Sequence, residues 1–434
     1  MTKELLNSLY NAFLSCNKQI CTDTRKNMEN TLFFCLTGEN YNGNTFALKA
    51  IEGGAKYVVT NNKTIVHDSV FLVDDPNQTL ADLAKMHASK IQGKLVAVAG
   101  SNGKTTTKEL INLILESKYQ TKSTPGNFNN HIGVPLTILS IDESDQIGII
   151  ELGTNHPGEM KFLCDLFIPD CGVITNIGKE HLEGFGNIEE VAKEESELFN
   201  TLIQHNQLVI LNLDDYWLGN MGKRLSKKTT YSCNDKTADF YLKIQTEMPY
   251  LQFEFFENGQ SLGHYKSEMG GKYNAYNLLA AVSIGKYYKI NASESMALAC
   301  TYIPKNNRSE WIHTKDKSIF LDAYNANPSS VISSLESFMT IPESKSIFLG
   351  DMLELGEASD VEHQNIFDYI TSKDVKDVFF VGDIYHRVLG NYPFKFENTD
   401  ALLAWLDTHP IESKYAYIKG SRGIKMEKIL EHFK

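Results

Sequence analysis

Short apolar runs alternate with amphipathic stretches along this chain, and that alternation predicts an α/β protein. Apolar runs bounded by polar turns are typical of strands, whereas apolar residues spaced three and four apart are typical of helices. In residues 1–92 the pattern predicts strands at Thr31–Leu36, Tyr57–Thr60 and Val70–Val73 and helices at Leu5–Ser15, Asn44–Gly53 and Thr79–Lys90. We therefore expect a small α/β unit at the start of the chain.

The middle of the chain, residues 93–304, repeats the alternation on a larger scale. Its apolar runs predict strands at Lys94–Ala99, Gln146–Glu151, Cys171–Thr175 and Leu208–Asn212. Helical segments between these runs favour a mostly parallel sheet, because parallel neighbours need a crossover connection. Between Tyr231 and Glu268 the helical pattern is missing, and three runs predict a small antiparallel insert: Tyr241–Ile244, Leu251–Phe256 and Gly263–Lys266.

A turn-rich segment, Ile303–Asn307, is the best candidate for a linker. After it the strand–helix alternation restarts, with predicted strands at Ser318–Asp322, Ser346–Gly350, Val378–Gly382 and Ala416–Lys419. A chain of 434 residues is too long for one ordinary core, so several domains are expected. The pattern separates three of them, at residues 1–92, 93–304 and 305–434.

Composition narrows the class of protein. A formal net charge of −12 argues against non-specific binding to nucleic acid or to anionic membranes, while leaving room for a local basic pocket. No apolar run approaches the roughly 20 residues needed to span a bilayer, and the N-terminal segment lacks the apolar core of a signal peptide. The seven cysteines are scattered without a CxxC pair, which predicts reduced thiols in a cytoplasmic protein.

The most informative motif follows the first strand of the middle region. The run Lys94–Ala99 breaks at Gly100-Ser101-Asn102-Gly103-Lys104-Thr105-Thr106, which leads into a predicted helix, Thr105–Glu116. Glycines there let backbone N–H groups point at an anion, and the helix N-terminus adds its positive dipole end. Lys104 can reach the outer phosphates, and the Thr105 hydroxyl can ligate Mg²⁺. The spacing departs from the standard G-x4-G-K-[ST], but the flanking strand and helix favour a nucleoside triphosphate site over a chance surface turn.

Two further strands lead to residues suited to a metal. Glu151 closes one predicted strand, and His181 lies just beyond another. Because ligands bind outside the carboxyl ends of parallel strands, both side chains are candidates to hold Mg²⁺. The competing interpretations are a solvated strand-end glutamate and a structural histidine.

Asparagines supply further polar candidates. Asn129 and Asn130 lie in a turn-rich loop, where they suit a substrate carboxylate or phosphate, or a simple Asx turn. Asn274 and Asn277 share a helix face near its start, where they could read a base edge or cap the helix.

The last region places basic and amide groups after predicted strands, which suggests that it closes over the triphosphate. These groups lie at Arg308 and in the segments Asp322–Pro328, Gly350–Gly356 and Lys419–Arg422.

These blocks, in this order, resemble the Mur ligase family, the ATP-dependent peptide ligases of bacterial cell-wall precursor synthesis. The matching segments are Asn129–Thr137, Glu151–Glu159, His181–Gly186, Tyr324–Pro328, Gly350–Gly356 and Lys419–Arg422. Thr22–Arg25 and Leu32–Glu39 match the family's UDP-sugar-binding domain. The blocks look most like the branch that joins D-Ala-D-Ala to UDP-N-acetylmuramoyl-tripeptide, and the resemblance covers essentially the whole chain.

The resemblance implies a monomer of three domains: a UDP-binding α/β domain, a central ATP-binding domain and a Rossmann-like C-terminal domain. It implies that ATP phosphorylates the terminal carboxylate of the tripeptide, and that the amine of D-Ala-D-Ala attacks the resulting acyl phosphate. Phosphoryl transfer between two anions needs charge neutralisation, which Lys104 and two Mg²⁺ ions can supply.

The resemblance also implies roles for single residues. The candidate nucleotide-binding residues are Gly100, Asn102, Gly103, Lys104, Thr105, Thr106, Asn274 and Asn277 near adenine, Arg308 at the γ-phosphate and Asp322 at the ribose. The candidate metal ligands are Thr105 and Glu151 for one Mg²⁺ and His181 for the second, to which our own hypothesis, given below, adds Glu195. The catalytic candidates are Lys104, Glu151, His181 and Arg308. The candidate substrate-binding residues are Thr24, Arg25, Gly38, Asn129, Asn130, Asn325 and Asn327.

Two positions depart from the family's pattern. The family usually has a carbamylated lysine after the histidine motif, but the aligned position here is Glu195. Our hypothesis is that Glu195 itself supplies the carboxylate; the alternatives are Lys193 as a substitute, or an amphipathic helix whose charges simply face water. Tyr273 stands where the family commonly has histidine, which leaves the geometry around adenine open.

Other classes of protein remain as alternatives. A P-loop GTPase would need an Asn-Lys-x-Asp segment, which the sequence lacks. A Mur ligase that adds diaminopimelate or lysine would favour Asp-Asn-Pro-Arg where this chain has Tyr324–Pro328. A folylpolyglutamate synthetase and a catalytically impaired nucleotide-binding scaffold complete the set.

Overall fold

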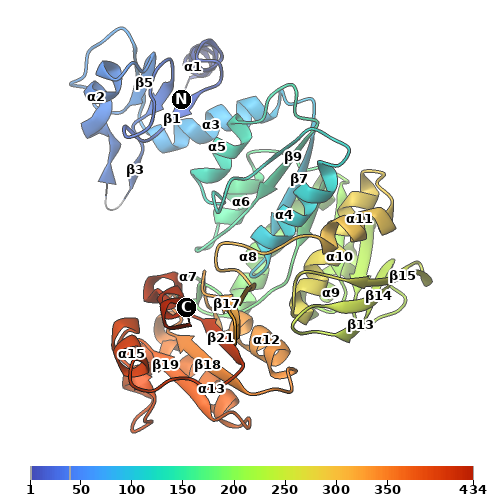
Figure 1. Ribbon diagram of the computed structural model, residues 1–434. Coiled ribbons are helices and arrows are strands. Elements are labelled where there is room, and N and C mark those ends of the chain that lie inside the picture. Colours follow the sequence, from blue (N-terminus) through green and yellow to red (C-terminus); the bar gives the residue numbers. More distant parts are fainter. Residues whose placement is uncertain (1, 39–40, 434) are drawn as a thin grey trace.

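The computed structural model describes residues 2–38 and 41–433, and within that range three main sheets follow one another along the chain (Figure 1). The N-terminal unit has a parallel sheet in the order β1-β2-β5-β6. Its strands are β1 (Ile20–Cys21), β2 (Leu32–Phe34), β5 (Tyr57–Thr60) and β6 (Val70–Leu72). Its helices are α1 (Lys3–Ser15), α2 (Ala47–Glu52) and α3 (Pro76–Ala88), and β3 (Thr37–Gly38) pairs with β4 (Tyr41–Asn42) in a short ribbon.

The central unit contains a nine-stranded sheet in the order β15-β14-β13-β12-β11-β10-β7-β9-β8. Its strands are β7 (Lys94–Ala99), β8 (Thr121–Ser123), β9 (Ile147–Glu151), β10 (Cys171–Ile174), β11 (Leu208–Asn212), β12 (Lys228–Ser232), β13 (Phe240–Thr246), β14 (Gln252–Glu257) and β15 (Gln260–Lys266). Its helices are α4 (Lys104–Leu115), α5 (Gly133–Leu139), α6 (Glu159–Cys164), α7 (Leu182–Phe185), α8 (Ile188–Gln204), α9 (Tyr216–Met221), α10 (Lys272–Tyr287) and α11 (Ala292–Cys300).

The predicted antiparallel insert is an extension of this sheet. Strands β13, β14 and β15 are antiparallel to one another, as predicted, but β13 pairs in parallel with β12 and so continues the main sheet. Residues at the start of the expected insert, such as Tyr231, lie in β12 itself. The pattern missed β12 because only Tyr231 and Ser232 of its five residues are buried, so no apolar run marks it.

The C-terminal unit has six strands in the order β16-β17-β21-β18-β19-β20, all parallel except β16. The strands are β16 (Glu310–His313), β17 (Ser318–Asp322), β18 (Lys345–Gly350), β19 (Asp377–Val381), β20 (Lys395–Phe396) and β21 (Tyr415–Lys419). The helices are α12 (Pro328–Met339), α13 (Ser359–Thr371), α14 (Asp383–Val388) and α15 (Thr399–Leu406). In the part of the chain that the structure describes, no helix is both long and apolar enough to cross a membrane.

The N-terminal and central units share a hydrophobic core, which we call the apolar junction. Helix α3 packs on α1 and on α5, and Leu83 of α3 and Ile138 of α5 are fully buried in the same apolar cluster. Within it His87 is buried, with Nε2 2.8 Å from the carbonyl of Ile141 and Nδ1 3.1 Å from the hydroxyl of Tyr10. Because the Ile141 carbonyl can only accept, Nε2 carries the proton and Nδ1 accepts from Tyr10.

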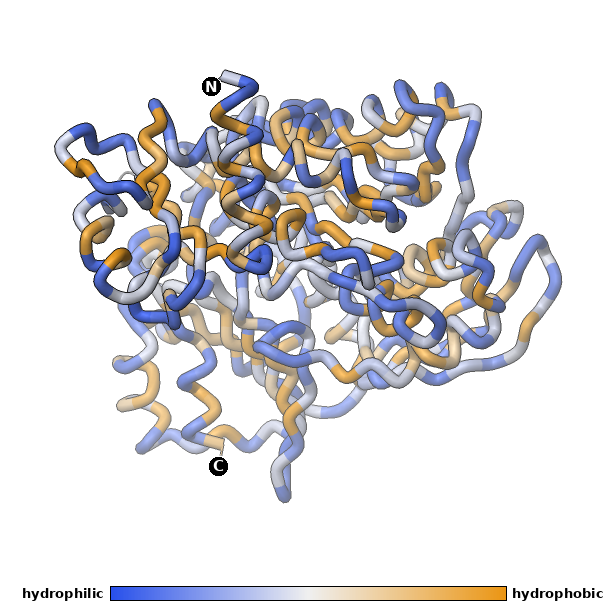
Figure 2. The backbone as a smooth tube through the Cα atoms, turned by 90° about the horizontal axis from the view of Figure 1, so that it is seen from above, coloured by the Kyte–Doolittle hydropathy of each residue, from blue (hydrophilic) through white to orange (hydrophobic). Residues whose placement is uncertain are grey.

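The C-terminal unit meets the central unit through polar groups, which we call the polar junction. Its contacts are Asn327 Nδ2 to Asn102 Oδ1 (2.9 Å), Lys179 Nζ to Glu362 Oε1 (2.6 Å) and His181 Nδ1 to Glu354 Oε2 (2.8 Å). Two apolar side chains of the central unit, Leu182 and Met248, join the C-terminal core. Figure 1 shows the N-terminal unit against the central unit beside α3 and α5, standing apart from the C-terminal unit. In Figure 2 hydrophilic residues dominate the outer connections, while hydrophobic stretches follow the helices and strands.

Candidate active site

A cavity of about 890 Å³ lies at the polar junction. Central-unit residues on its wall include Ser101–Thr106, Asn129, Asn130, Glu151, Glu180, His181, Asn274 and Asn277. C-terminal residues on its wall include Arg308, Asp322, Tyr324, Asn325, Asn327, Glu354 and Lys419. Most of the residues singled out for nucleotide and metal therefore meet in one space, although they come from segments far apart in the sequence.

The glycine turn between β7 and α4 has the conformation that an anion cradle needs. Gly100 and Gly103 have φ of +113° and +83°, values that side chains with a Cβ rarely adopt. A Cβ on Gly100 would lie 2.6 Å from the backbone nitrogen of Thr175, and one on Gly103 would lie 2.5 Å from Asn277 Oδ1. Gly103 is also the N-cap of α4, with no side chain covering the first N–H groups of the helix. These donors are therefore free to bind phosphate oxygens.

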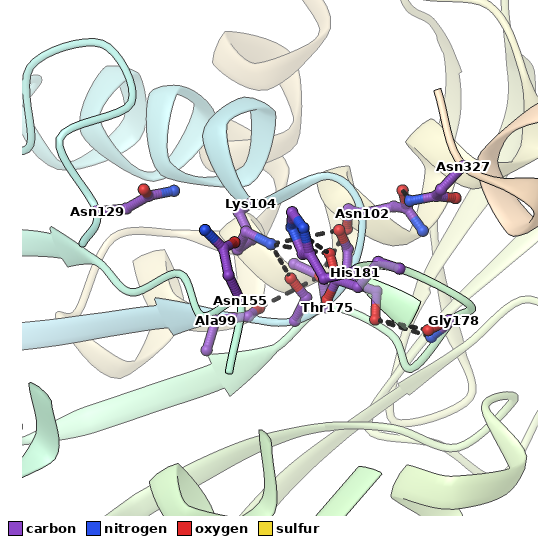
Figure 3. A network of polar contacts seen from close by, with 12 residues as sticks. Ala99, Asn102, Lys104, Asn129, Asn155, Thr175, Gly178, His181 and Asn327 are labelled. Carbon is purple, nitrogen blue, oxygen red and sulfur yellow. Dashed lines mark hydrogen bonds and ion pairs between the residues drawn. The ribbon is translucent and has the colours of Figure 1, made fainter. Parts of the chain in front are cut away.

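Lys104 lies on the wall of the cavity, in the polar network with Asn102 and Thr175 (Figure 3). Its Nζ donates to the carbonyl of Gly100 at 2.5 Å and lies 3.5 Å from Glu180 Oε2. Burial lowers the pKa of Lys104, but the nearby carboxylates of Glu180, Glu195 and Glu151 outweigh burial, so its pKa is raised. Lys104 is therefore a fixed cation beside the cradle.

Glu151, at the end of β9, lies next to the threonine of the cradle. Its Oε1 accepts hydrogen bonds from Thr105 Oγ1 at 3.1 Å and from Asn129 Nδ2 at 2.9 Å. Its Oε2 has no hydrogen-bond partner among the described residues and lies 3.9 Å from Nζ of the fully buried Lys108. A buried carboxylate oxygen without a donor, beside a threonine hydroxyl, has the chemistry of a Mg²⁺ ligand.

Comparison with known proteins finds relatives that match most of this chain. Residues 98–285 match the family model of the Mur ligase middle domain, and residues 307–405 match that of the Mur ligase glutamate ligase domain. A Bacillus subtilis protein named UDP-N-acetylmuramoyl-tripeptide–D-alanyl-D-alanine ligase is 32% identical, with 95% of this chain and 92% of the relative covered. The chain belongs to the Mur ligase family. An Escherichia coli protein of the same name is 29% identical, again over 95% of this chain and 92% of the relative.

Solved structures of Mur ligases share the fold. A crystal structure of MurF from Acinetobacter baumannii superposes with a TM-score of 0.88 at 23% identity, covering 96% of this chain and 93% of that one. MurF ligase from Thermotoga maritima in complex with ADP superposes with a TM-score of 0.85 at 24% identity, covering 100% and 98%. The α/β fold predicted from the sequence is confirmed.

His181 connects the two walls of the cavity in this Mur ligase. It has a left-handed backbone (φ 45°) at the start of α7, so its ring is held at the carboxyl end of the sheet. Nδ1 lies 2.8 Å from Glu354 Oε2 of the C-terminal unit, and Nε2 lies 3.9 Å from Glu180 Oε2. The hydrogen bond with His181 lowers the pKa of Glu354. With Nδ1–H donated to a carboxylate, Nε2 is left with its lone pair for a metal.

Helix α8 separates the two interpretations of its charged run. Glu194 and Glu195 are both buried, whereas the side chain of Lys193 is 74% exposed and pairs with Glu190 at 3.1 Å. Glu194 accepts hydrogen bonds from the backbone N–H groups of Gly158 (2.8 Å) and Met160 (2.6 Å). The idea that all the charges of this helix face water is therefore wrong for Glu194 and Glu195.

Glu195 is the unexplained member of the pair. Its side chain is 1% exposed, and neither carboxylate oxygen has a hydrogen-bond partner among the described residues. Burial raises its pKa to about 8, with Lys104 acting to lower it and Glu180 to raise it further. Across the described chain, no three histidine, cysteine or acidic side chains form a ready-made metal site. A small number of protein ligands is compatible with Mg²⁺, because Mg²⁺ takes one or two carboxylates from a protein and completes its coordination shell with phosphate oxygens and water.

The asparagine candidates divide between ligand-facing and structural positions. Asn130 accepts from the backbone of Ile132 (3.1 Å) and Gly133 (2.9 Å), the Asx turn that was the alternative to a ligand role. On α10, Asn277 donates to Asn274 Oδ1 at 2.9 Å, and Asn274 donates to a backbone carbonyl. The N-cap of α10 is Gly271, without a side-chain cap, so these asparagines do not have the capping role that was their alternative.

The C-terminal candidates lie along the opposite wall. Asp322 accepts from the backbone of Ser309 at 3.0 Å and pairs with the buried Lys419 at 2.5 Å. Asn327 caps α12 through Oδ1 and reaches Asn102 of the cradle through Nδ2 (Figure 3). Asn325 Oδ1 accepts from the next backbone N–H.

The candidates for UDP-sugar binding lie outside this cavity. Thr24, Arg25 and Gly38 belong to the N-terminal unit, and Arg25 forms a 2.7 Å ion pair with Asp23. Their predicted role therefore requires a second part of the binding surface, in the N-terminal unit.

Three residues of the site had no role in the sequence analysis. Glu180 pairs with Lys104, Glu354 with His181, and Lys108 lies beside Glu151 while donating to the Thr124 carbonyl at 2.6 Å. Glu354 lies inside a matched segment, and Glu180 directly precedes one. Lys108 follows Lys104 by one helical turn, so for Lys108 helical spacing was the available signal.

Proposed function

We propose that this chain is an ATP-dependent ligase that joins D-Ala-D-Ala to the terminal carboxylate of UDP-N-acetylmuramoyl-tripeptide through an acyl phosphate. The observation that carries the proposal is the cavity at the polar junction, which brings the cradle, Lys104 and Glu151 opposite Arg308 and Asp322. Relatives that bear this ligase name match nearly the whole chain, and one solved relative holds ADP.

The residues of the cradle suit a triphosphate. We assign the uncapped N–H groups at the start of α4 and the cation of Lys104 to the β- and γ-phosphates, and Arg308 to the γ-phosphate. Asn274 and Asn277 are assigned to the adenine side, and Asp322 to the ribose. A carboxylate is a poor electrophile and must first be phosphorylated. The carboxylate and the triphosphate are both anions, so the cations Lys104 and Arg308 would reduce the repulsion between them.

Two Mg²⁺ ions fit the donors that remain. Thr105 and the unpartnered oxygen of Glu151 would hold one ion, and His181 and Glu195 would help to hold the second. When bound, the ions would neutralise charge on the transferring phosphoryl group. Glu195 has a carboxylate of its own in the position where the family commonly carbamylates a lysine, so we propose that this chain needs no CO₂-derived ligand.

The chemistry then proceeds in two displacements. An oxygen of the tripeptide carboxylate forms a bond to the γ-phosphorus as ADP departs, within reach of Lys104 and Arg308. The amine of the dipeptide attacks the activated carbonyl carbon, and phosphate leaves with the former carboxylate oxygen. Lys104 and Arg308 lie on opposing walls of the cavity at the polar junction. We propose that the tripeptide carboxylate, ATP and the dipeptide amine bind between these walls, so that the reacting groups are close to one another.

We assign the three predicted domains accordingly. Residues 1–92 would bind the UDP-muramoyl end through Thr24, Arg25 and Gly38, and residues 93–304 would bind ATP. Residues 305–434 would bind the dipeptide, with Asn325 and Asn327 near the reacting groups, and Asn129 and Asn130 would face the tripeptide. We expect a cytoplasmic monomer.

The test is phosphate release from ATP and Mg²⁺ with UDP-N-acetylmuramoyl-tripeptide, with and without D-Ala-D-Ala, with the product weighed by mass spectrometry. Release that requires both substrates and yields a pentapeptide is expected. Release with a single amino acid in place of the dipeptide would point to an amino-acid-adding ligase, and no release would point to an impaired nucleotide-binding protein.

A further inference from the structure

Two of the five arginines in this chain approach one tyrosine ring. The guanidinium carbon of Arg308 lies 3.5 Å from the centre of the Tyr324 ring, and that of Arg422 lies 5.6 Å from it. Arg25 and Arg387 instead pair with aspartates. Within residues 2–38 and 41–433, neither Arg308 nor Arg422 has an acidic partner or a hydrogen bond from its guanidinium. The ring attracts both cations but leaves their charges uncompensated.

The turn that carries Arg422 is fixed on two sides. Ser421, just before it, accepts from the backbone N–H of Leu353 at 2.9 Å and donates to the carbonyl of Ala326 at 3.4 Å. The backbone N–H of Ser421 donates to the carbonyl of Asp351 at 3.1 Å. These bonds tie the turn after β21 to the loop after β18 and to the Tyr324–Asn327 loop. Arg422 is therefore held beside Tyr324 by its backbone, while its side chain stays exposed.

The two arginines differ in what surrounds them. Arg308, Tyr324 and Asn325 line the cavity assigned to ATP, whereas Arg422 is outside that lining. Because Arg422 is outside this lining, we assign it an anion other than the γ-phosphate that is assigned to Arg308. Arginine binds carboxylates in a bidentate manner, which suits a site that recognises a chain end.

The acceptor of the proposed reaction has one such group. D-Ala-D-Ala carries the reacting amine at one end, a free carboxylate at the other and only methyl groups between. Two residues of extended chain reach about 7 Å, which is comparable with the 3.5 Å and 5.6 Å that separate the two guanidinium carbons from the centre of the Tyr324 ring. With its amine beside the γ-phosphate, the dipeptide would place its carboxylate near Arg422.

We infer that Arg422 and Tyr324 form the binding site for the free carboxylate of the acceptor dipeptide. The inference rests on the proposed function and deepens it, because it says which group distinguishes the acceptor. The guanidinium of Arg422 binds the carboxylate, and the Tyr324 ring, which the guanidiniums of Arg422 and Arg308 both approach, lies beside the dipeptide.

The experiment compares D-Ala-D-Ala with its C-terminal carboxamide in the full-length enzyme, at saturating ATP and UDP-muramoyl-tripeptide. The wild-type enzyme is expected to prefer the carboxylate in kcat/KM by about 100-fold, since a charged partner is lost in the carboxamide. In Arg422→Met, KM for D-Ala-D-Ala is expected to rise by about 100-fold and the preference to fall to within about threefold. Arg422→Lys should recover part of the preference, because it restores the charge without the bidentate geometry.

Lys425→Met is the matched control, because Lys425 is an exposed cation at the end of the same turn. It should keep the KM and the preference of the wild type. A preference that survives in Arg422→Met would overturn the inference while leaving the ligase intact, and a rise in KM for ATP alone would assign Arg422 to the nucleotide instead. A wild-type enzyme that ligates neither acceptor would overturn the proposed function itself.

Discussion

The two junctions of this protein differ in the kind of contact that forms them: one is mainly apolar and the other is mainly polar. The apolar junction buries Leu83 and Ile138 in one continuous cluster, and its main polar group, His87, has both ring nitrogens hydrogen-bonded. The polar junction joins side chains such as Asn102 with Asn327 and His181 with Glu354 around a cavity. The first holds two units in a fixed relation, because separating them would expose apolar surface to water.

The polar side chains of the second junction can exchange their present hydrogen-bond partners for a ligand. Its polar contacts join groups that water, phosphate or a metal could also satisfy, and its apolar contacts include Leu182 and Met248. Separating these units therefore costs less hydrophobic free energy than separating the units at the apolar junction. We therefore expect ligands to change the relation of the C-terminal unit to the rest, and mutations at the two junctions to have different effects. Substitutions at the apolar junction should lower stability, and those at the polar junction should lower activity.

The largest effect is expected from Lys104→Met at the cradle. Removing one preorganised cation should lower kcat by about 10³-fold, since a single such donor contributes about 2.7–4 kcal/mol to transition-state stabilisation. Single-turnover kinetics of pentapeptide formation would measure it. Lys193→Met, which changes an exposed cation on α8, is the control and should behave as the wild type. A Lys104→Met enzyme with ordinary turnover would remove the cradle from the mechanism.

At the apolar junction, Leu83→Ala should destabilise the protein by about 3 kcal/mol, because it leaves a cavity in the shared core. Urea denaturation followed by circular dichroism would measure the free energy of unfolding. Leu14→Ala on α1 is the matched control, since Leu14 is 42% exposed and should cost well under 1 kcal/mol. We expect kcat of the folded Leu83→Ala enzyme to stay near that of the wild type; a kcat that falls with stability would blur the contrast between the junctions.

The neighbouring residues Glu194 and Glu195 of α8 are expected to differ: substitution of one should affect stability, and substitution of the other should affect metal binding. Glu195→Gln should weaken Mn²⁺ binding, measured by electron paramagnetic resonance with a non-hydrolysable ATP analogue, by at least about tenfold. It should not lower the melting temperature, because it replaces a buried carboxyl group that has no hydrogen-bond partner among the described residues. Glu194→Gln should do the reverse, costing about 1.5–3 kcal/mol of stability through its bonds to Gly158 and Met160.

The same pair tests the source of the carboxylate. Wild-type activity should not depend on added bicarbonate, and Lys193→Ala should retain activity. Activity that rises with bicarbonate and disappears in Lys193→Ala would assign the ligand to a modified lysine and refute the role of Glu195.

The smallest effect is expected from Glu354→Ala at the polar junction. Losing the acceptor for His181 Nδ1–H should weaken Mn²⁺ or ATP binding by about tenfold with little change in melting temperature. Glu354→Gln should recover most of the affinity, because an amide oxygen can still accept the hydrogen bond. Glu357→Ala, an exposed glutamate three residues on, is the control. A loss of stability without a loss of affinity would give Glu354 a structural role only.

Much of the fold could be predicted from the pattern of apolar residues. Buried central strands such as β7 and β11 are continuous apolar runs, and both were predicted to the residue. The half-exposed strands β12 and β16 were missed, because Lys228–Ser232 and Glu310–His313 have no apolar run. Without β12, the pairing that makes β13 part of the main sheet could not be foreseen.

The candidate site was predictable where one continuous segment contains all the residues that bind the ligand. The glycine turn with Lys104 and Thr105 needed only its flanking strand and helix to be found. Contacts between units were not predictable, because Glu354 acquires its partner, His181, only when the C-terminal unit packs against the central unit. Burial of the two glutamates was not predictable either, because the sequence Glu194-Glu195 is typical of a solvated helix face. Only the packing shows that Glu194 accepts a hydrogen bond from the backbone of Gly158, whereas Glu195 has no hydrogen-bond partner among the described residues.

The most direct test is to follow an oxygen atom through the reaction. UDP-muramoyl-tripeptide labelled with ¹⁸O in its terminal carboxylate is incubated with ATP, Mg²⁺ and D-Ala-D-Ala, and the released phosphate is examined by ³¹P nuclear magnetic resonance. One ¹⁸O per phosphate, appearing only as pentapeptide forms, is predicted, because the carboxylate oxygen leaves with the phosphoryl group. Unlabelled phosphate, or label found in AMP, would show that this cavity does not transfer the γ-phosphoryl group to the carboxylate.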